Sequence, residues 1–293
     1  MTPVIDLHAH SCFSDGNLRP EELVNRAHEK GVQILALTDH DETEGLAFAR
    51  DQAQKLGMQL INGVEISVTW NSKTVHIVGL GIDVDNDTLQ DGLVRIRQER
   101  IVRAKKISDK LQKAGIENVY SEIISKYGME AVTRTHFAHY LVEHGHVKDL
   151  NKAFKQYLGR KGRAFVNGHW ISLEECVQMV VAAGGQAVIA HPVRYKLSNQ
   201  KLETLVQDFK SYGGTGIEVV ASRYTEQDKA YMASIARRHE LLASVGSDFH
   251  FPGNPYVELG YNLTLPPDTR AIWETWPEYQ ELARTFHENR GVF

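Results

Sequence analysis

The stretch Val4-Ile5-Asp6-Leu7-His8-Ala9-His10 decides how this chain folds and what it can bind. Its apolar start predicts a short strand, and alternate residues of a strand point to the same side. His8 and His10 therefore leave the end of the strand on one side, close enough to share a metal ion. The sequence thus begins with the first two ligands of a predicted metal site.

The same arrangement recurs along the chain, where strand-like apolar runs carry or precede a histidine or a carboxylate. The run 58–64, for example, is expected to end at Glu65. In α/β folds ligands bind at the carboxyl ends of the strands. A single histidine beside a strand is more often a packed core residue, but repeated coincidence predicts a shared site. The further predicted ligands are Asp15, His40, Glu65, His76, His191, Asp248 and His250. Eight histidines remain outside this site, and all of them except His136 are expected to be surface or packing residues.

The composition is that of a globular protein without a membrane anchor. The chain has 293 residues, of which 42% are hydrophobic and 24% are charged. It contains no apolar run of about 18 residues, the length that a membrane-spanning helix needs. Met1-Thr2-Pro3 leads directly into the first strand, so we expect no secretory signal. Cys12 and Cys176 are far apart, which favours the reducing cytoplasm and argues against a thiolate zinc site.

Helix and strand signals alternate, which predicts an α/β fold with a mainly parallel sheet or barrel. The alternation stops in the middle of the chain, where residues 88–114 predict one long charged helix, followed by shorter ones. We therefore divide the chain into a first barrel part (1–94), a helical insertion (95–163) and a second barrel part (164–293). The insertion has 16 Lys and Arg against 7 Asp and Glu, although the whole chain has a net charge of −4. This basic segment predicts contact with a polyanion over the strand ends, or simply a solvated helix face.

Taken together, the motifs resemble those of the PHP (polymerase and histidinol phosphatase) metal-dependent phosphoesterases. Two further motifs resemble the RNase AM subgroup of 5′→3′ exoribonucleases, whose relatives act as nucleoside 3′,5′-bisphosphate phosphatases. These are Val132-Thr133-Arg134-x-His136-Phe137-Ala138 and His191-Pro192-x-Arg194-Tyr195. The family motifs are His8-x-His10, Asp15-Gly16, Thr38-Asp39-His40, Gly63-Val64-Glu65, His76, Ala190-His191-Pro192 and Gly246-Ser247-Asp248-x-His250.

The resemblance implies a distorted (β/α)7 barrel that holds up to three divalent ions beneath the insertion. It places His8, His10, Glu65 and Asp248 around one ion, with Glu65 bridging to a second ion held by His76 and His191. Asp15, His40 and His250 would hold a third, and Asp39 would orient a ligating imidazole. Mixed imidazole and carboxylate ligands suit Mn²⁺, Fe²⁺ or Zn²⁺, whereas a site of oxygens alone would suit Mg²⁺ or Ca²⁺. Mn²⁺ is our first choice among the three.

A metal-bridging hydroxide would then attack phosphorus, so no side-chain nucleophile is needed. A Gly-x-Ser-x-Gly motif is absent from the sequence, which argues weakly against a serine hydrolase. Arg134, Arg194 and His136 are the predicted contacts to a second phosphate, because the arginine fork matches phosphate oxygens. Lys161 and Arg163 could extend an RNA path. The general acid is not assigned.

The resulting hypothesis is a cytoplasmic 5′→3′ exoribonuclease that binds RNA 5′ ends or short oligonucleotides and releases nucleoside 5′-monophosphates. One alternative is a small-molecule phosphatase that acts on nucleoside bisphosphates or another phosphomonoester such as histidinol phosphate. Another is a non-catalytic barrel that has lost its metals. No obligate protein partner is expected.

Overall fold

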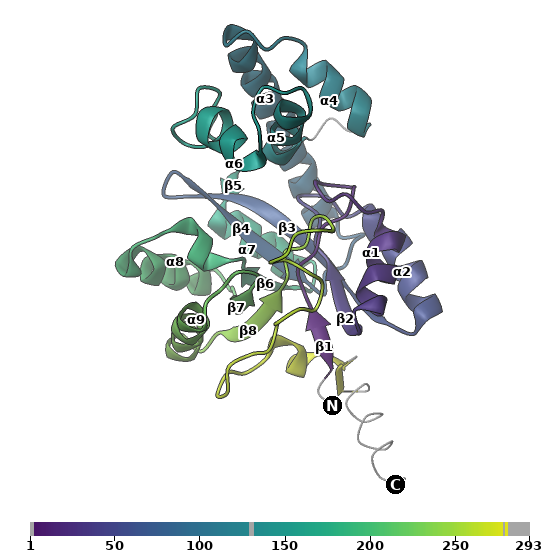
Figure 1. Cartoon of the computed structure of the whole chain (residues 1–293). Coiled ribbons are helices and arrows are strands. Elements are labelled where there is room, and N and C mark those ends of the chain that lie inside the picture. The colour runs from purple at the N-terminus through teal and green to yellow at the C-terminus, as the bar shows by residue number, and fades with distance from the viewer. Residues whose placement is uncertain (1–2, 129–131, 278, 281–293) are drawn as a thin grey trace.

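Within the described residues, seven strands form the wall of a nearly closed barrel in the order β1-β2-β3-β4-β6-β7-β8 (Figure 1). This computed structural model describes residues 3–128, 132–277 and 279–280. Backbone N–H groups that follow β1 bind carbonyls at the other end of the sheet, Leu7 to Val245 at 3.1 Å and His10 to Phe249 at 2.9 Å. The predicted seven-stranded α/β barrel is confirmed. Its strands are Val4–Asp6 (β1), Val32–Leu37 (β2), Gln59–Trp70 (β3), Lys73–Leu80 (β4), Gln186–Ile189 (β6), Gly216–Ala221 (β7) and Leu242–Gly246 (β8).

Strands β3 and β4 form a long hairpin that the sequence did not predict. The turn consists of Asn71 and Ser72, whose φ angles of 44° and 60° suit the tight turns that join antiparallel strands. Strand β4 pairs antiparallel with both β3 and β6, whereas the other neighbours in the barrel order are parallel. The expectation that Glu65 follows a strand end is therefore wrong. Glu65 and His76 both lie inside strands, and His76 pairs with Ser67, which is two residues after Glu65.

Helices cover the outside of the barrel (Figure 1). The apolar residues Leu173, Cys176, Val177 and Val180 of α7 are buried in the same core as residues of β3, β4 and β6. Among the described residues no helix has the length and apolar character needed to cross a membrane. The outer helices are Pro20–Glu29 (α1), Gly45–Leu56 (α2), Leu173–Ala182 (α7), Asn199–Ser211 (α8) and Glu226–Arg238 (α9); Pro192–Tyr195 (η2) and Ile272–Thr275 (η3) are single 3₁₀ turns, and Ile171–Ser172 (β5) pairs with β3.

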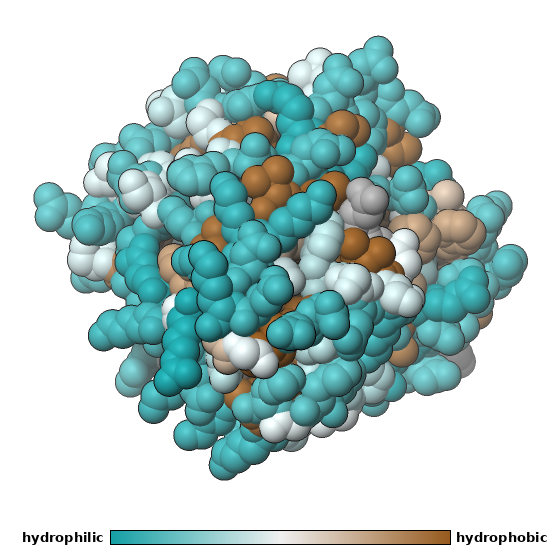
Figure 2. Space-filling model, turned by 90° about the horizontal axis from the view of Figure 1, so that it is seen from above, coloured by the Kyte–Doolittle hydropathy of each residue, from teal (hydrophilic) through white to brown (hydrophobic). Residues whose placement is uncertain are grey.

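The helical insertion lies at one end of the barrel, at the top of Figure 1. Its first helix joins two separate cores, because Leu93 and Ile96 pack in the barrel while Ile107 and Leu111 pack with the other insertion helices. The change of core thus falls inside a continuous helix, just after our proposed boundary at residue 95. From above, the molecule is mainly hydrophilic, with small separate apolar patches (Figure 2). The insertion contains Asp87–Lys113 (α3), Val119–Tyr127 (α4), Arg134–Glu143 (α5), Leu150–Ala153 (α6) and the π-helical turn Phe154–Leu158 (η1).

Candidate metal centre and phosphate pocket

The nine side chains predicted to bind metal lie together. Their ligand atoms form three groups, and within each group all atoms lie within 4.8 Å of one another. His40 and Glu65 each belong to two groups, so neighbouring ions could share them. The groups are His10, Asp15, His40 and His250; His8, Glu65, His191 and Asp248; and His40, Glu65 and His76.

Glu65 is the fully buried centre of this cluster. Its Oε1 lies 2.8 Å from both His76 Nδ1 and His191 Nε2. Its Oε2 lies 3.2 Å from Nε2 of both His8 and His10. Two oxygens that face different histidines suit a carboxylate that bridges two cations, as the resemblance implies.

The grouping by distance differs from the implied ligand sets at three histidines. His10 falls with Asp15 and His250, His191 falls with His8, and His40 falls also with Glu65 and His76. His10 Nε2 is nevertheless 3.1 Å from Asp248 Oδ1, so it stands between two groups. The assignment of each histidine to one ion therefore stays a prediction.

The carboxylates of the cluster are ionised. Burial raises the pKa of Asp15, Glu65 and Asp248, but the charges of nearby histidines, and of Arg194 beside Asp248, outweigh it and hold each pKa well below its usual range. Within the described part of the chain, Asp15 Oδ1 and Glu65 Oε2 are buried and accept no hydrogen bond, although histidine nitrogens lie 3.3 Å and 3.0 Å from them. A buried charged oxygen without a hydrogen bond is costly, and divalent cations would satisfy both oxygens. The donor set thus fits the implied metals.

Glu218 in β7 orients His8 of the cluster, a role that was not predicted from the sequence. His8 Nδ1 lies 2.6 Å from Glu218 Oε1, and the backbone N–H of His191 donates to Oε2 at 2.5 Å. The ring of His8 therefore presents Nε2 to the cluster, as expected for a metal-binding histidine with a carboxylate partner. Gly246 leaves room for this pair, because a Cβ there would lie 2.2 Å from the Cβ of His8.

Asp39 holds the loop after β1 rather than an imidazole. Its Oδ1 accepts from the backbone N–H of Ser11 at 2.7 Å and from Ser14 Oγ at 2.6 Å, and its Oδ2 accepts from Ser11 Oγ at 2.6 Å. Ser14 Oγ in turn lies 3.5 Å from His10 Nδ1. Asp39 thus reaches a predicted ligand only through Ser14, which differs from the direct contact that we expected.

Four arginines line the same cavity of about 220 Å³ as the ligand cluster: Arg100, Arg103, Arg134 and Arg194. Two of them have carboxylate partners. Arg100 Nε donates to Asp41 Oδ2 at 2.6 Å, and Arg194 Nη1 donates to Asp248 Oδ2. Arg194 is therefore tied to a predicted metal ligand.

Arg103 and Arg134 have no carboxylate partner among the described residues. Burial and the charges of neighbouring arginines lower the pKa of both guanidinium groups, which shows that positive charge is concentrated here. Arg103 Nε donates to the backbone carbonyl of Val166 at 3.2 Å and its guanidinium lies 5.4 Å from the ring centroid of Trp170. The pair leaves unneutralised positive charge in the cavity, which suits an anion such as phosphate.

His136, the third predicted phosphate contact, does not line this cavity. Its Nδ1 accepts from the backbone N–H of Thr133 at 3.0 Å and so caps the start of α5. Its ring packs on Tyr127 with centroids 4.4 Å apart, and burial lowers its pKa to about 4. The structure thus gives His136 the role of a helix cap, and its contact with phosphate stays a prediction.

Residues 6–288 match the PHP domain model, in agreement with this geometry. The chain belongs to the PHP domain family. It is 45% identical to the 3′,5′-nucleoside bisphosphate phosphatase of Chromobacterium violaceum, over 92% of this chain and 95% of that one. It is 40% identical to the 5′-3′ exoribonuclease Rnm of Escherichia coli, over 94% of this chain and 95% of that one. A solved structure, described as an amidohydrolase from Chromobacterium violaceum with bound sulfate and no metal, superposes with a TM-score of 0.88 at 45% identity, over 92% and 95%. The predicted family is confirmed.

The PHP motifs supplied the ligand residues but not the arginines of α3. A signal for these existed in the sequence. Arg100 and Arg103 occupy the buried stripe of the helix, in spacing with Ile96, Ile107 and Leu111. A charged residue at an apolar-stripe position needs a buried partner, so this spacing indicates a polar site beneath the helix.

Proposed function

We propose that this PHP protein is a phosphoester hydrolase that degrades RNA from the 5′ end, hydrolysing the 3′ phosphodiester of the 5′-terminal nucleotide and releasing nucleoside 5′-monophosphates. The observation that carries the proposal is that one cavity contains both the ligand cluster and the unpaired arginines Arg103 and Arg134. The cluster would act on one phosphate while the arginines hold another. The name of the Escherichia coli relative, 5′-3′ exoribonuclease Rnm, agrees with this activity.

The three ligand groups would hold up to three divalent ions, for which Mn²⁺ is our first choice and Fe²⁺ or Zn²⁺ the alternatives. Such ions neutralise charge on phosphoryl oxygens and lower the pKa of water from about 16 to roughly 7. The residues of the chain supply the ionised oxygens of Asp15, Glu65 and Asp248 in a buried setting. Glu218 and Ser14 orient the imidazoles of His8 and His10.

Arg103 and Arg134 would bind the 5′-phosphate of the terminal nucleotide. A hydrogen bond to a charged group contributes about 1.5–3 kcal/mol. With the 5′-phosphate held there, the next phosphate along the chain lies toward the ligand cluster. Hydrolysis leaves a new 5′-phosphate on the shortened RNA, so the cycle can repeat in one direction.

The second candidate is a nucleoside 3′,5′-bisphosphate phosphatase, and the same geometry favours it. A nucleoside 3′,5′-bisphosphate ends in a 3′-phosphate where RNA continues, so its two phosphates would occupy the same two positions. Its hydrolysis is the same reaction on a monoester. The Chromobacterium violaceum relative bears this name. The excess of Lys and Arg in residues 95–163 favours the longer substrate, because several cations can contact several phosphates.

The cellular setting that we propose is RNA processing in the cytoplasm. Cys12 and Cys176 are both free thiols, which suits a reducing compartment. We propose no obligate protein partner. A non-catalytic role would require loss of metal binding, and metal analysis of the purified protein tests this directly.

The test compares RNA hexamers that carry a 5′-monophosphate, a 5′-hydroxyl or a 5′-triphosphate with adenosine 3′,5′-bisphosphate, all in Mn²⁺. We expect mononucleotides from the 5′-monophosphate RNA. Activity confined to the bisphosphate would establish the second candidate instead.

Arg134→Ala tests the phosphate pocket. We expect kcat/KM on 5′-monophosphate RNA to fall about 10- to 150-fold, the loss of one charged hydrogen-bonded contact. Metal content and the slow reaction of 5′-hydroxyl RNA should not change. Arg238→Ala, which removes an exposed arginine paired with Glu203 on the outer surface, is the matched control. An equal loss on both RNA ends would contradict this role for Arg134.

A further inference from the structure

The metal cavity adjoins a second cavity that Arg103 and Arg134 do not line. This second cavity, of about 540 Å³, shares five lining residues with the metal cavity: Thr135, Phe154, Arg194, Asp248 and His250. A third, of about 460 Å³, shares Ser222, Arg223 and Tyr224 with the second. The three cavities are thus neighbours in a row that extends from the ligand cluster to the surface at the end of β7.

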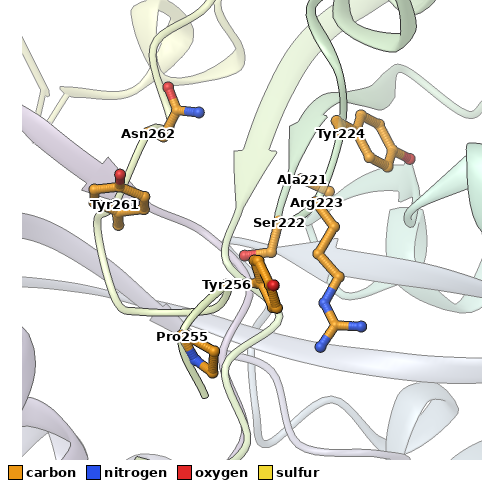
Figure 3. A pocket seen from close by; sticks show the side chains of 8 residues that line it. All are labelled: Ala221, Ser222, Arg223, Tyr224, Pro255, Tyr256, Tyr261 and Asn262. Atoms are coloured by element: carbon orange, nitrogen blue, oxygen red, sulfur yellow. The ribbon is translucent and has the colours of Figure 1, made fainter. Parts of the chain in front are cut away.

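The outer end of this path has exposed aromatic rings. Tyr256 and Tyr261 are 68% and 67% exposed and line the third cavity together with Arg223 and Asn262. We call these four residues the tyrosine groove. Figure 3 shows Arg223 reaching down beside Tyr256, with Tyr261 and Asn262 on the opposite side. The Arg223 guanidinium lies 5.6 Å from the ring centroid of Tyr256, and Arg223 Nη2 donates to Asn254 Oδ1 at 3.4 Å.

These residues have the chemistry that binds single-stranded nucleic acid. Exposed aromatic rings stack on bases of any identity, and an arginine contacts the backbone. Isolated exposed tyrosines are common, but these two rings share one cavity with an arginine on a path that starts at the predicted catalytic cluster. A ligand that contacts both the ligand cluster and the two tyrosine rings must be an extended chain.

We propose that the tyrosine groove binds the RNA nucleotides on the 3′ side of the scissile phosphate. The direction follows from where the arginines lie, since Arg103 and Arg134 line neither the second nor the third cavity. With the 5′-phosphate held by these arginines, the remaining RNA leaves the ligand cluster by the other path. This inference rests on the proposed exoribonuclease function and names how that enzyme holds a long substrate.

A mononucleotide cannot reach the groove, and this separates the groove from the reaction itself. The bases that lie beyond the cleaved phosphate are present in an oligonucleotide and missing in adenosine 3′,5′-bisphosphate. The groove should therefore affect KM for RNA and leave the bisphosphate reaction unchanged.

The test measures kcat and KM for 5′-monophosphate RNAs of two to eight nucleotides and for adenosine 3′,5′-bisphosphate. In the wild-type protein we expect KM to fall with RNA length and then level off. In Tyr256→Ala and Tyr261→Ala we expect KM for the longer RNAs to rise about 5- to 100-fold, the loss of one base stack, with kcat and bisphosphate hydrolysis unchanged. Tyr256→Phe keeps the ring and should behave like the wild type.

The outcomes separate the two proposals. Wild-type KM values for RNA in both alanine variants, with RNA still degraded from the 5′ end, would overturn the proposed role of the tyrosine groove. They would leave the proposed exoribonuclease function standing. Equal losses on RNA and on the bisphosphate would show a merely structural role and also overturn it. A wild-type protein that hydrolyses only the bisphosphate would overturn the exoribonuclease function, and the groove with it.

Discussion

The substitution Glu218→Gln tests how the ligand cluster is held in place. Glu218 is 1% exposed, and its two oxygens bind His8 Nδ1 at 2.6 Å and the backbone N–H of His191 at 2.5 Å. Gln keeps the size of the side chain but loses its charge, and its amide has one acceptor oxygen in place of two. One of the two contacts must therefore weaken.

The expected effect is on metal affinity. Removing the carboxylate partner of a metal-binding histidine typically lowers metal affinity about 10- to 100-fold. This ratio corresponds to about 1.4–2.7 kcal/mol at 25 °C. Because Glu218 touches neither the phosphate pocket nor a second ligand side chain, high Mn²⁺ should restore most of the activity.

The assay is calorimetric titration of the chelator-stripped protein with Mn²⁺, followed by activity measured over a range of Mn²⁺ concentrations. Glu240→Gln, which changes a side chain that is 86% exposed and pairs with Lys210, is the matched control and should bind metal like the wild type. An unchanged affinity in Glu218→Gln would show that the packing around His8 fixes its ring without the carboxylate, and would refute the reasoning.

Two further predictions concern the same cluster. Metal binding at about pH 7 should release protons, because hydrogen bonds to Asp248 and Glu65 overcome the effect of burial and raise the pKa of His10 to about 10. His10 is thus protonated in the metal-free protein below about pH 10, and Mn²⁺ affinity should rise as the pH rises toward that value. Heats of Mn²⁺ binding that do not vary with the ionisation enthalpy of the buffer would contradict the release of protons. Gly246→Ala should lower the free energy of unfolding of the metal-free protein by about 1–3 kcal/mol, the usual cost of overpacking. The added Cβ would lie 2.2 Å from that of His8, and an unchanged urea midpoint would count against this close approach.

The sequence predicted the barrel and the members of the ligand cluster because both have local signals. A histidine at or just beyond the end of an apolar run, as at His8, His40 or His191, shows its position at a strand end without any knowledge of the partner strand. Glu218 carries no such signal. It lies in the fully buried strand β7, and its role depends on His8, which is 210 residues away in the chain.

The β3–β4 hairpin escaped prediction for a related reason. Apolar residues continue through Ile66 and Val68, but the strand was expected to end at Glu65, as other apolar runs of the chain end at a predicted ligand. Inside the barrel Glu65 contacts His8, His10 and His76, so the strand continues past it. His136 carries two signals. Its place in a family motif suggested a ligand contact, and its spacing of three residues from Thr133 is that of a helix cap, which is the contact seen in the structure.

The two parts of the molecule contribute different halves of the site. All nine predicted metal ligands come from residues 1–94 and 164–293, while Arg100, Arg103 and Arg134 come from the insertion. The buried pair of Arg100 with Asp41, with an N–O distance of 2.6 Å, fixes helix α3 to the loop after β2.

This division has a consequence for substrate choice. A barrel without the insertion could keep the metal ligands but would lose the unpaired cations that we propose hold the 5′-phosphate. Changes in residues 95–163 should therefore alter which phosphoesters are cleaved, whereas changes in the barrel ligands should abolish hydrolysis of all of them. Breaking the Arg100–Asp41 pair should shift discrimination between 5′-phosphate and 5′-hydroxyl RNA without loss of metal, since neither residue belongs to the ligand groups.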